Sequence, residues 1–265
     1  KSKKIILLKG YKSFLAFSFC FAVFFLSFLF PVLQMLYWTI IFPKHFIDLN
    51  SLQLFINTIL LVSFSSIVLI FFAFISNYGN RLSRSKVLEA LTTFSISGYA
   101  IPGIILAVAF ITFISWFDNN VIKLLGTETI KPIFIGSILG LVLVYFVRFY
   151  SLAYNGIKSD YLKINYSIDE SSYLHGFSKF KTFTNIHIPY LKNSIFLIGV
   201  LISIEIIKEL PITLIMRPFN FETFATTAYI FASQDLLEAA AAPSLFLIFT
   251  ASIFILITSR YIVRD

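Results

Sequence analysis

Charge and cysteine are both scarce in this 265-residue chain. Charged residues make up 13% of the sequence and hydrophobic residues 58%, which is more apolar side chain than one soluble core of this length could bury. We therefore expect lipid to be the main solvent of the folded chain. The one cysteine, Cys20, lies inside an apolar run, so an internal disulfide bond is excluded.

Motifs of nucleotide binding and catalysis are absent as well. The sequence has no glycine-rich phosphate loop, so any coupled ATP hydrolysis must take place on another chain. Its three histidines, His45, His175 and His187, lack the paired spacing of a zinc site, and no nucleophile lies at a meaningful spacing from a base. We expect no catalytic residue, no cofactor and no bound metal in this chain.

The formal net charge of +8 raises the question of a nucleic-acid partner. The 21 Lys and Arg residues are scattered between apolar runs, however, which is typical of the flanks of membrane spans and not of a basic binding stripe. The sequence therefore argues against nucleic-acid binding.

Long apolar runs are abundant. Six windows are long and apolar enough to cross a bilayer as helices: Phe14–Ile41, Leu54–Asn77, Leu91–Phe117, Ile133–Ala153, Ile195–Met216 and Pro243–Val263. They predict an all-α, polytopic membrane protein with about six transmembrane helices, in a single domain over residues 1–265. Proline interrupts two windows, at Ala100–Gly103 and at Leu210–Pro211, and each break is either a hinge or an ordinary kink.

The distribution of positive charge predicts the orientation of these spans. Only five Lys and Arg residues fall on one side of the bilayer or at its helix ends: Lys44, Lys123, Lys131, Lys208 and Arg217. The other sixteen of the 21 fall on the opposite side, which the positive-inside rule identifies as the cytoplasm. Both termini are therefore expected in the cytoplasm, together with one long basic loop between Arg148 and Lys192.

That basic loop carries the most informative local pattern. Ser167 and Glu170 have the spacing of a capping box that starts a short helix, and Gly176 is suited to end it. Ser178 can begin a second helix. Two short helices around a glycine turn would form a knob that another protein could bind; the alternative is a solvated loop in which Glu170 only caps a helix.

The same segment resembles the cytoplasmic signature of ABC-importer permeases, which reads E-A-A, three residues, G, nine residues, I, one residue, L-P. Four residues match this signature: Glu170, Gly176, Ile186 and Pro189. Three others replace its residues conservatively, with Ser171 and Ser172 in place of the two alanines and Ile188 in place of the leucine. The resemblance implies a type I ABC-importer transmembrane domain whose residues 156–194 form the coupling loop for an ATPase subunit dimer. It implies coupling roles for Asp169, Glu170, Ser171, Ser172, Gly176, Ile186 and Pro189.

Further motifs narrow the resemblance to the permeases of ferric-iron importers. They are Gly98–Gly103, Val147–Phe149, and the run Lys208–Thr223 continued by Ala225 and Ala232–Ser233. The resemblance implies that ferric iron, delivered by a periplasmic Fe(III)-binding protein, crosses the bacterial inner membrane. It also implies a second permease half, because these permeases are commonly one chain of two tandem halves. This sequence is similar to the second half, and it does not begin with Met.

The fifth predicted span contains ionisable residues near the bilayer centre. Glu205, Lys208 and Glu209 have the spacing to share one helix face, directly before Pro211. They predict either a polar lining or gate of the translocation pathway, or an ion pair that only stabilises the bundle. Carboxylate oxygens suit a hard cation such as Fe(III), but one or two carboxylates are too few for a metal site.

The residues leave several functions open. Related permeases import thiamine, polyamines or organophosphonates with the same architecture, although the run Lys208–Thr223 favours iron. A secondary transporter or a channel subunit would need no ATPase. A membrane-embedded enzyme would need catalytic residues that the sequence does not show.

Overall fold

The computed structural model describes residues 9–43, 50–83, 85–125 and 132–262 of the chain, and the regular secondary structure in these ranges is helical. Six helical segments are long and apolar enough to cross a membrane: Tyr11–Ile41, Ser51–Ser83, Gly103–Ile122, Ile138–Tyr161, Lys179–Ile207 and Leu237–Arg260. The prediction of an all-α, multi-pass membrane protein with about six spans is confirmed.

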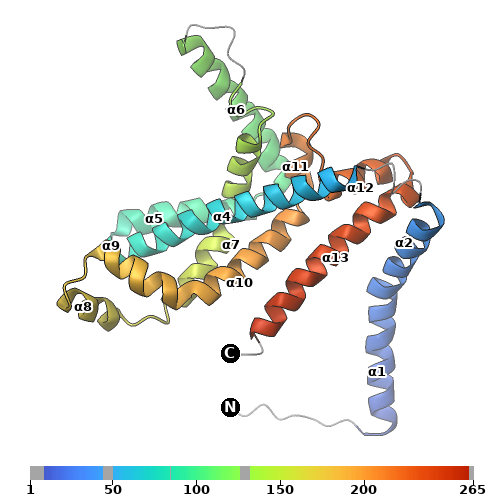
Figure 1. The fold of residues 1–265 in the computed structure, drawn as a ribbon, viewed down its shortest axis with the longest axis horizontal. Coiled ribbons are helices and arrows are strands. Elements are labelled where there is room, and N and C mark those ends of the chain that lie inside the picture. The colour runs from blue at the N-terminus through green and yellow to red at the C-terminus, as the bar shows by residue number, and fades with distance from the viewer. Residues whose placement is uncertain (1–8, 44–49, 84, 126–131, 263–265) are drawn as a thin grey trace.

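The order of the helices is shown in Figure 1. The first half contains α1 (Tyr11–Phe24), a π-helical turn (Phe25–Leu29), α2 (Phe30–Ile41), α4 (Ser51–Ser83), α5 (Lys86–Ser95), a 3₁₀ turn (Ile96–Ala100) and α6 (Gly103–Leu125). The second half contains α7 (Ile138–Tyr161), α8 (Tyr166–Leu174), α9 (Lys179–Thr182), a π-helical turn (Phe183–His187), α10 (Ile188–Ile207), α11 (Pro211–Met216), α12 (Phe224–Ser233) and α13 (Leu237–Ile262). The sequence windows did not predict α12, a short apolar helix.

The centre of the bundle is formed by α4, α7 and α10, which pack against one another. Large apolar residues of the core form most of these contacts, and polar and small residues add to them, as is common between membrane helices. The hydroxyls of Ser66 and Ser203 lie 3.1 Å apart between α4 and α10, and the Asn77 amide donates to the Tyr154 carbonyl at 3.1 Å between α4 and α7. These bonds fix the register of the three helices.

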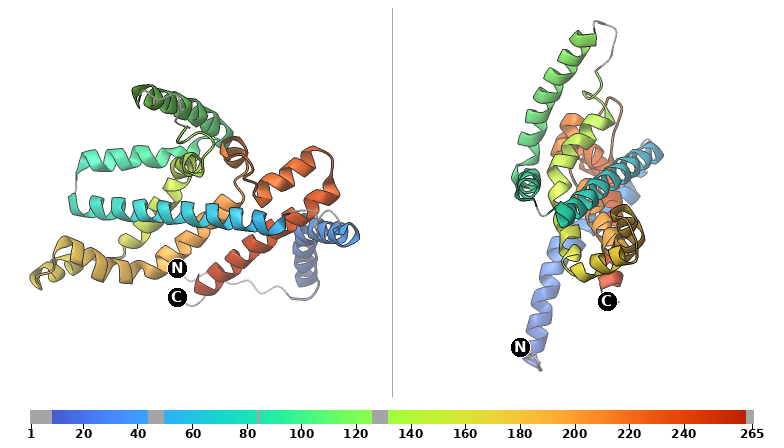
Figure 2. Two further views of the ribbon diagram at one scale, coloured as in Figure 1. Left: turned by 45° about the horizontal axis from the view of Figure 1, so that its top comes forward. Right: turned by 90° about the vertical axis from the view of Figure 1, so that its left-hand side faces the viewer.

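The remaining helices are arranged around this centre. The last span, α13, packs on α12, α2 and α10, and α6 packs on α11 and α7, whereas α1 extends away from the other helices (Figures 1 and 2). No residue of α1 is buried within the chain. The short helices α8 and α9 lie at the end of the bundle opposite to α12 (Figure 1). The bundle therefore has two distinct ends, one of which carries the predicted coupling segment.

The third and fourth spans differ from their predicted windows. The third window began at Leu91, but this residue lies in the separate helix α5, and the span begins only at Gly103, after Pro102. Proline disfavours the helical conformation of the residue before it, so the window contains two helices. The fourth window ended at Ala153, but α7 continues to Tyr161. Arg148 therefore lies in the middle of the fourth span. We had predicted it at the exit of that span, where the basic loop begins.

The fifth span also differs from its window. Its helical run starts at Lys179 and ends at Ile207, and a new helix, α11, begins at Pro211. The segment predicted as a loop over residues 156–194 is thus shortened by helices that enter it from both sides. Only residues 162–178 lie between the two spans, and we call this stretch the interspan loop.

Candidate functional site

The interspan loop is built around the short helix α8. Its N-cap is Asn165, whose side-chain oxygen accepts a hydrogen bond from the Ser167 amide at 3.2 Å. The predicted capping box of Ser167 and Glu170 is therefore wrong. Asparagine is as good an N-cap as serine, and it starts the helix two residues earlier.

The end of α8 is a glycine turn, as predicted. Gly176 has φ +80°, a conformation that side chains with a Cβ disfavour. Its amide donates to the Tyr173 carbonyl at 2.9 Å, and the Phe177 amide donates to the Ser172 carbonyl at 3.1 Å, which is the bond pattern of a Schellman motif. Ser178 then caps α9 through a bond from the Lys181 amide, which confirms the predicted start of the second helix.

Three side chains hold α8 against the bundle, and we call Arg81, Asp169 and His187 the loop anchor. Asp169 is buried on the inner side of α8. One of its oxygens lies 2.6 Å from Nε of Arg81, near the end of α4, and the other lies 2.7 Å from Nε2 of His187, directly before α10. A single carboxylate thus connects the loop to two spans.

The Arg81 guanidinium makes further contacts with the loop. It donates to the backbone carbonyls of Ile164 at 3.0 Å and Asn165 at 3.1 Å, and more weakly to that of Tyr161 at 3.3 Å. The Tyr166 ring packs against it, with 4.3 Å between the guanidinium carbon and the ring centroid. Arginine suits this position because its planar fork can serve several acceptors at once.

Aromatic rings enclose His187, which is fully buried. The Tyr78 and Tyr161 rings lie 5.2 and 5.4 Å from its ring, centroid to centroid. Near it, Tyr78 donates to the Lys179 carbonyl at 2.6 Å, so α4 also holds the start of the fifth span. A hydroxyl contact of 2.7 Å between Ser172 and Thr182 joins α8 to α9.

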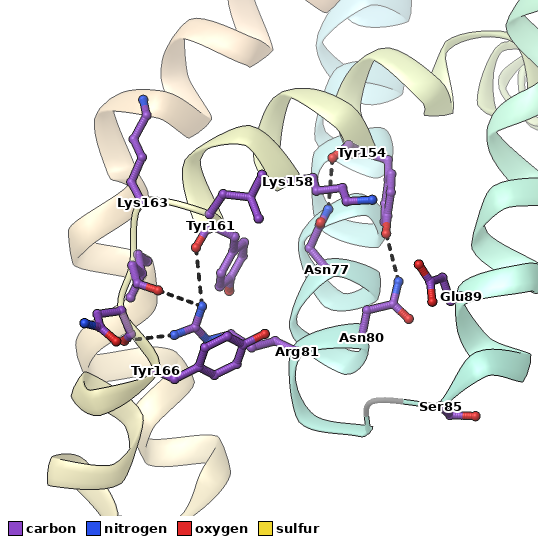
Figure 3. Close-up of a pocket in the computed structure, with 13 residues that line it drawn as sticks. Asn77, Asn80, Arg81, Ser85, Glu89, Tyr154, Lys158, Tyr161, Lys163 and Tyr166 are labelled. Carbon is purple, nitrogen blue, oxygen red and sulfur yellow. Dashed lines mark hydrogen bonds between the residues drawn. The ribbon is translucent and has the colours of Figure 1, made fainter.

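A recess of about 710 Å³ lies beside the loop anchor, and Figure 3 shows the residues that line it. Arg81 and Tyr166 line it, together with Asn77 and Asn80 of α4. Asn80 donates to the Tyr154 hydroxyl at 2.8 Å, so the last turns of α4 bond to α7 and then to the loop in succession. These bonds connect the end of α4 with the end of α7 and with the start of α8.

The outer side of α8 and α9 is free of the bundle. Glu170 and Ser171 are exposed, and so are two large apolar side chains, Leu174 at 88% and Phe180 at 75%. A groove of about 460 Å³ lies beside α8 and is lined by Ser167, Ile168, Ser171, Ser172, His175, Phe177 and Ile186. The seven predicted coupling residues therefore separate into two groups. Asp169 and Ser172 are buried and hold the loop, while Glu170, Ser171, Gly176 and Pro189 are exposed and Ile186 is half-buried.

The charged residues of the fifth span do not share one helix face. Glu205 and Lys208 form an i,i+3 ion pair at 2.7 Å. Because α10 ends at Ile207, the backbone turns before Glu209 and the Glu209 side chain takes another direction. The prediction that all three lie on one face is wrong for Glu209. Pro211 occupies the first turn of α11, where its missing N–H costs no hydrogen bond.

Glu209 instead faces Arg148 of α7. Nε of Arg148 lies 3.9 Å from a Glu209 carboxylate oxygen, and the guanidinium also donates to the Ile101 carbonyl at the break before α6. Gly103 leaves room for the carboxylate, because a Cβ there would lie 2.7 Å from the other Glu209 oxygen. The breaks of the third and fifth spans thus meet at one place on α7.

Comparisons with known proteins find similar structures but no similar sequences. The sequence matches no family model and no curated protein. The structure is similar to a bacterial alginate ABC transporter in complex with an alginate pentasaccharide-bound periplasmic protein, with a TM-score of 0.70 and 16% identity over 94% of this chain and 92% of that chain. It is also similar to a bacterial ABC transporter involved in the import of the acidic polysaccharide alginate, with a TM-score of 0.68 and 17% identity over 94% of this chain and 93% of that one.

The fold is that of an ABC-importer transmembrane subunit. The fold expected from the permease signature is confirmed, whereas these similarities give no support to ferric iron as the substrate. The sequence identities of 16 and 17% are also too low to assign alginate as the substrate of this chain.

Two residues of the loop anchor were missed in the sequence. Arg81 was counted only as a positive charge beside a span, and His187 was assigned to a loop. A weak signal was present for Arg81, because it is the one charged residue of α4 and follows the polar residue Asn77 at the i, i+4 spacing. His187 gave no such signal, since its partner Asp169 lies 18 residues away and the pairing depends on the fold.

The paired charges argue against a metal site within the spans. Each carboxylate of the fifth span has a cation nearby: Lys208 pairs with Glu205, and Arg148 lies beside Glu209. Across the described parts of the chain, no three His, Cys, Asp or Glu residues come together as potential metal ligands. A hard cation would meet neutralised carboxylates here.

Proposed function

We propose that this chain is the transmembrane subunit of a binding-protein-dependent ABC importer in the bacterial inner membrane, with both termini in the cytoplasm. The observation that carries the proposal is the two-sided interspan loop. Its inner side is fixed to the spans through buried charges, and its outer side presents exposed apolar residues and the carboxylate of Glu170. A loop that only connects two spans would need neither feature.

The outer side of the loop is the proposed docking surface for an ATPase subunit dimer. Leu174 and Phe180 supply exposed apolar area, and the exposed Glu170, which precedes the groove residue Ser171 in the chain, supplies a charge. Apolar anchors surrounded by polar residues are typical of protein–protein contacts. Closure of the ATPase dimer on ATP would displace α8, and hydrolysis would take place on the ATPase and not on this chain.

The inner side of the loop is the proposed transmission route. A displacement of α8 reaches α4 through the bond from Arg81 to Asp169 and reaches α10 through His187. Both contacts are short and buried, so the loop and the two spans respond as a rigid unit. Alternating access then follows from a rigid-body change of the bundle.

The proposed translocation pathway or gate lies near Glu205, Lys208, Glu209 and Pro211, where the fifth span breaks. A second permease half would supply the opposite wall. The exposed apolar α1, which no other part of the described chain buries, fits contact with lipid or with that half.

Ferric iron delivered by a periplasmic binding protein is the proposed substrate. The support is the resemblance of the run Lys208–Thr223 to permeases of iron importers. The neutralised charges near the break are consistent with a route that passes the ion on without capturing it, so the affinity would reside in the periplasmic protein. Thiamine, a polyamine or an organophosphonate are the alternative substrates.

Docking can be tested by co-purification of the full chain with an ATPase subunit, which we expect a neighbouring reading frame to encode. We expect the wild-type chain to retain the ATPase and Glu170→Lys to lose most of it. Glu89→Lys is the matched control, because Glu89 is also exposed and lies on α5, away from the groove. Failure of the wild-type chain to retain any ATPase, together with transport driven by an ion gradient alone, would refute the proposal in favour of a secondary transporter.

The substrate can be tested separately by uptake of radioactive iron in a deletion strain that carries the chain on a plasmid. We expect iron uptake to depend on the chain and to resist competition by thiamine, polyamines and phosphonates. Uptake of one of these competitors in place of iron would replace the substrate without affecting the ABC-importer assignment.

A further inference from the structure

The middle of α7 is in contact with both broken spans. On one side, the 3₁₀ turn that precedes the break of the third span lies so close that a Cβ at Gly98 would overlap the Val147 carbonyl oxygen. On the other side, the Tyr145 hydroxyl is hydrogen-bonded to Thr213 of α11, just after the break of the fifth span. Contacts within about one turn of α7, from Tyr145 to Arg148, thus hold two chain breaks against one helix.

Arg148 lies at the centre of these contacts. Its guanidinium donates to the Ile101 carbonyl, lies 5.7 Å from the Tyr99 ring centroid and approaches Glu209 to 3.9 Å. We call the Ile101 carbonyl, Arg148 and Glu209 the mid-span junction. An arginine inside a membrane span is costly unless it is paired, so a role beyond packing is expected for it.

The mid-span junction is paired but not satisfied. At 3.9 Å the charges of Arg148 and Glu209 attract each other without a hydrogen bond between Nε and the carboxylate. Nε of Arg148 and Oε1 of Glu209 are both buried, and neither has a hydrogen-bond partner in the described structure. Buried polar groups left in this way cost free energy. A second arrangement of the junction, in which these atoms are paired or hydrated, is therefore energetically accessible.

A single helix links the junction to the loop anchor. From Arg148 to Tyr161 at the end of α7 the distance along the helix is roughly 20 Å, at 1.5 Å per residue. The Tyr161 carbonyl accepts a bond from Arg81 at 3.3 Å, and the interspan loop follows directly. A displacement of the loop anchor along α7 thus reaches the mid-span junction without an intervening turn.

We propose that Arg148 is a positioning residue that holds the breaks of the third and fifth spans together, and that the mid-span junction separates when the bundle changes its access. The driver of this change, an ATPase acting on the interspan loop, rests on the proposed function. The junction itself is a property of this chain. Arg148 acts through the Ile101 carbonyl and Glu209 and needs no contact with substrate.

The test uses one reporter cysteine at the break of the third span. Ile101→Cys in a Cys20→Ser background keeps the backbone carbonyl and leaves a single thiol, and the Ile101 side chain is 39% exposed. The rate of labelling by a small maleimide is measured on the full chain in membrane vesicles. We expect Arg148→Gln to raise this rate at least fivefold, and Arg148→Lys to raise it less, because lysine keeps the charge but loses the planar fork.

Two further variants separate positioning from folding. In Arg148→Gln/Glu209→Gln no unpaired charge remains in the membrane, so we expect thermal stability near wild type together with fast labelling. Lys158→Gln is the matched control: it removes a positive charge from the same helix at an exposed position, and we expect an unchanged labelling rate.

The outcomes test the role of Arg148 separately from the proposed ABC-importer function. Wild-type labelling in the double glutamine variant would show that the pair does not hold the two breaks together, and it would overturn the proposal whether or not an ATPase is retained. Fast labelling of the Arg148 variants, in a chain that retains no ATPase, would support the positioning role of Arg148 and refute the proposed function.

Discussion

The loop anchor predicts a specific effect of replacing Arg81. In Arg81→Ala, Asp169 keeps His187 as its hydrogen-bond partner but loses its full cationic partner at 2.6 Å. The side chains of Arg81 and Asp169 are 7% and 9% exposed, so the bond is a buried ion pair. The interspan loop should then open locally while the spans stay inserted.

The magnitude follows from the burial of the pair. Removing one partner of a buried ion pair costs about 3–5 kcal/mol. Because His187 still bonds Asp169, and because water can reach the carbonyls that Arg81 served, we expect about 3 kcal/mol, the low end of this range. That free energy corresponds to about two powers of ten in the equilibrium between closed and open loop.

Amide hydrogen exchange in nanodiscs measures this equilibrium directly. We expect amides of α8 to exchange about 100-fold faster in Arg81→Ala than in the wild type, with unchanged exchange in the middle of α4 and α7. The control is Lys163→Ala, which removes an exposed i,i+3 pair with Asp160 worth about 0–1 kcal/mol. Exchange of α8 at the wild-type rate in Arg81→Ala would refute the loop anchor.

Three further predictions concern the loop and the junction. Gly176→Val meets open space but must adopt φ +80°, at a cost of about 1–2 kcal/mol, so we expect an inserted protein that has lost uptake in a transport assay. Leu174→Ser changes an exposed side chain, so the melting temperature should not change while retention of the ATPase falls several-fold. Gly98→Ala places a Cβ on the Val147 carbonyl oxygen, so the melting temperature should fall, and a wild-type melting curve would contradict the close approach of the 3₁₀ turn to α7.

The number of spans was predictable from the sequence, but their ends were not. Apolar length alone identifies a membrane helix, and each of the six windows overlaps a span of the structure. The predicted ends of the spans were wrong where a span contains polar residues. Asn155 and Lys158 discourage a span beyond Ala153, yet α7 continues because Tyr154, Ile157 and Tyr161 on another face of the helix are buried.

The candidate site was predictable as a segment but not as a set of contacts. The glycine turn at Gly176 and the cap at Ser178 follow from local geometry, which the sequence contains. The partners of Asp169 come from α4 and from the start of the fifth span, which lie 88 and 18 residues away. Pairings over such sequence separations depend on how the helices pack, so the local spacing of residues does not predict them.

The carboxylates of the loop anchor and of the mid-span junction are held differently, and this difference gives the proposed motion a direction. Asp169 in the loop anchor has both oxygens bonded, at 2.6 and 2.7 Å, whereas Glu209 in the mid-span junction has one oxygen at 3.9 Å from Arg148 and the other without a partner. A force applied to the interspan loop therefore meets a rigid contact first and is carried along α7 to a weaker one. The weaker contact lies where both broken spans meet, so it is the place where the bundle yields.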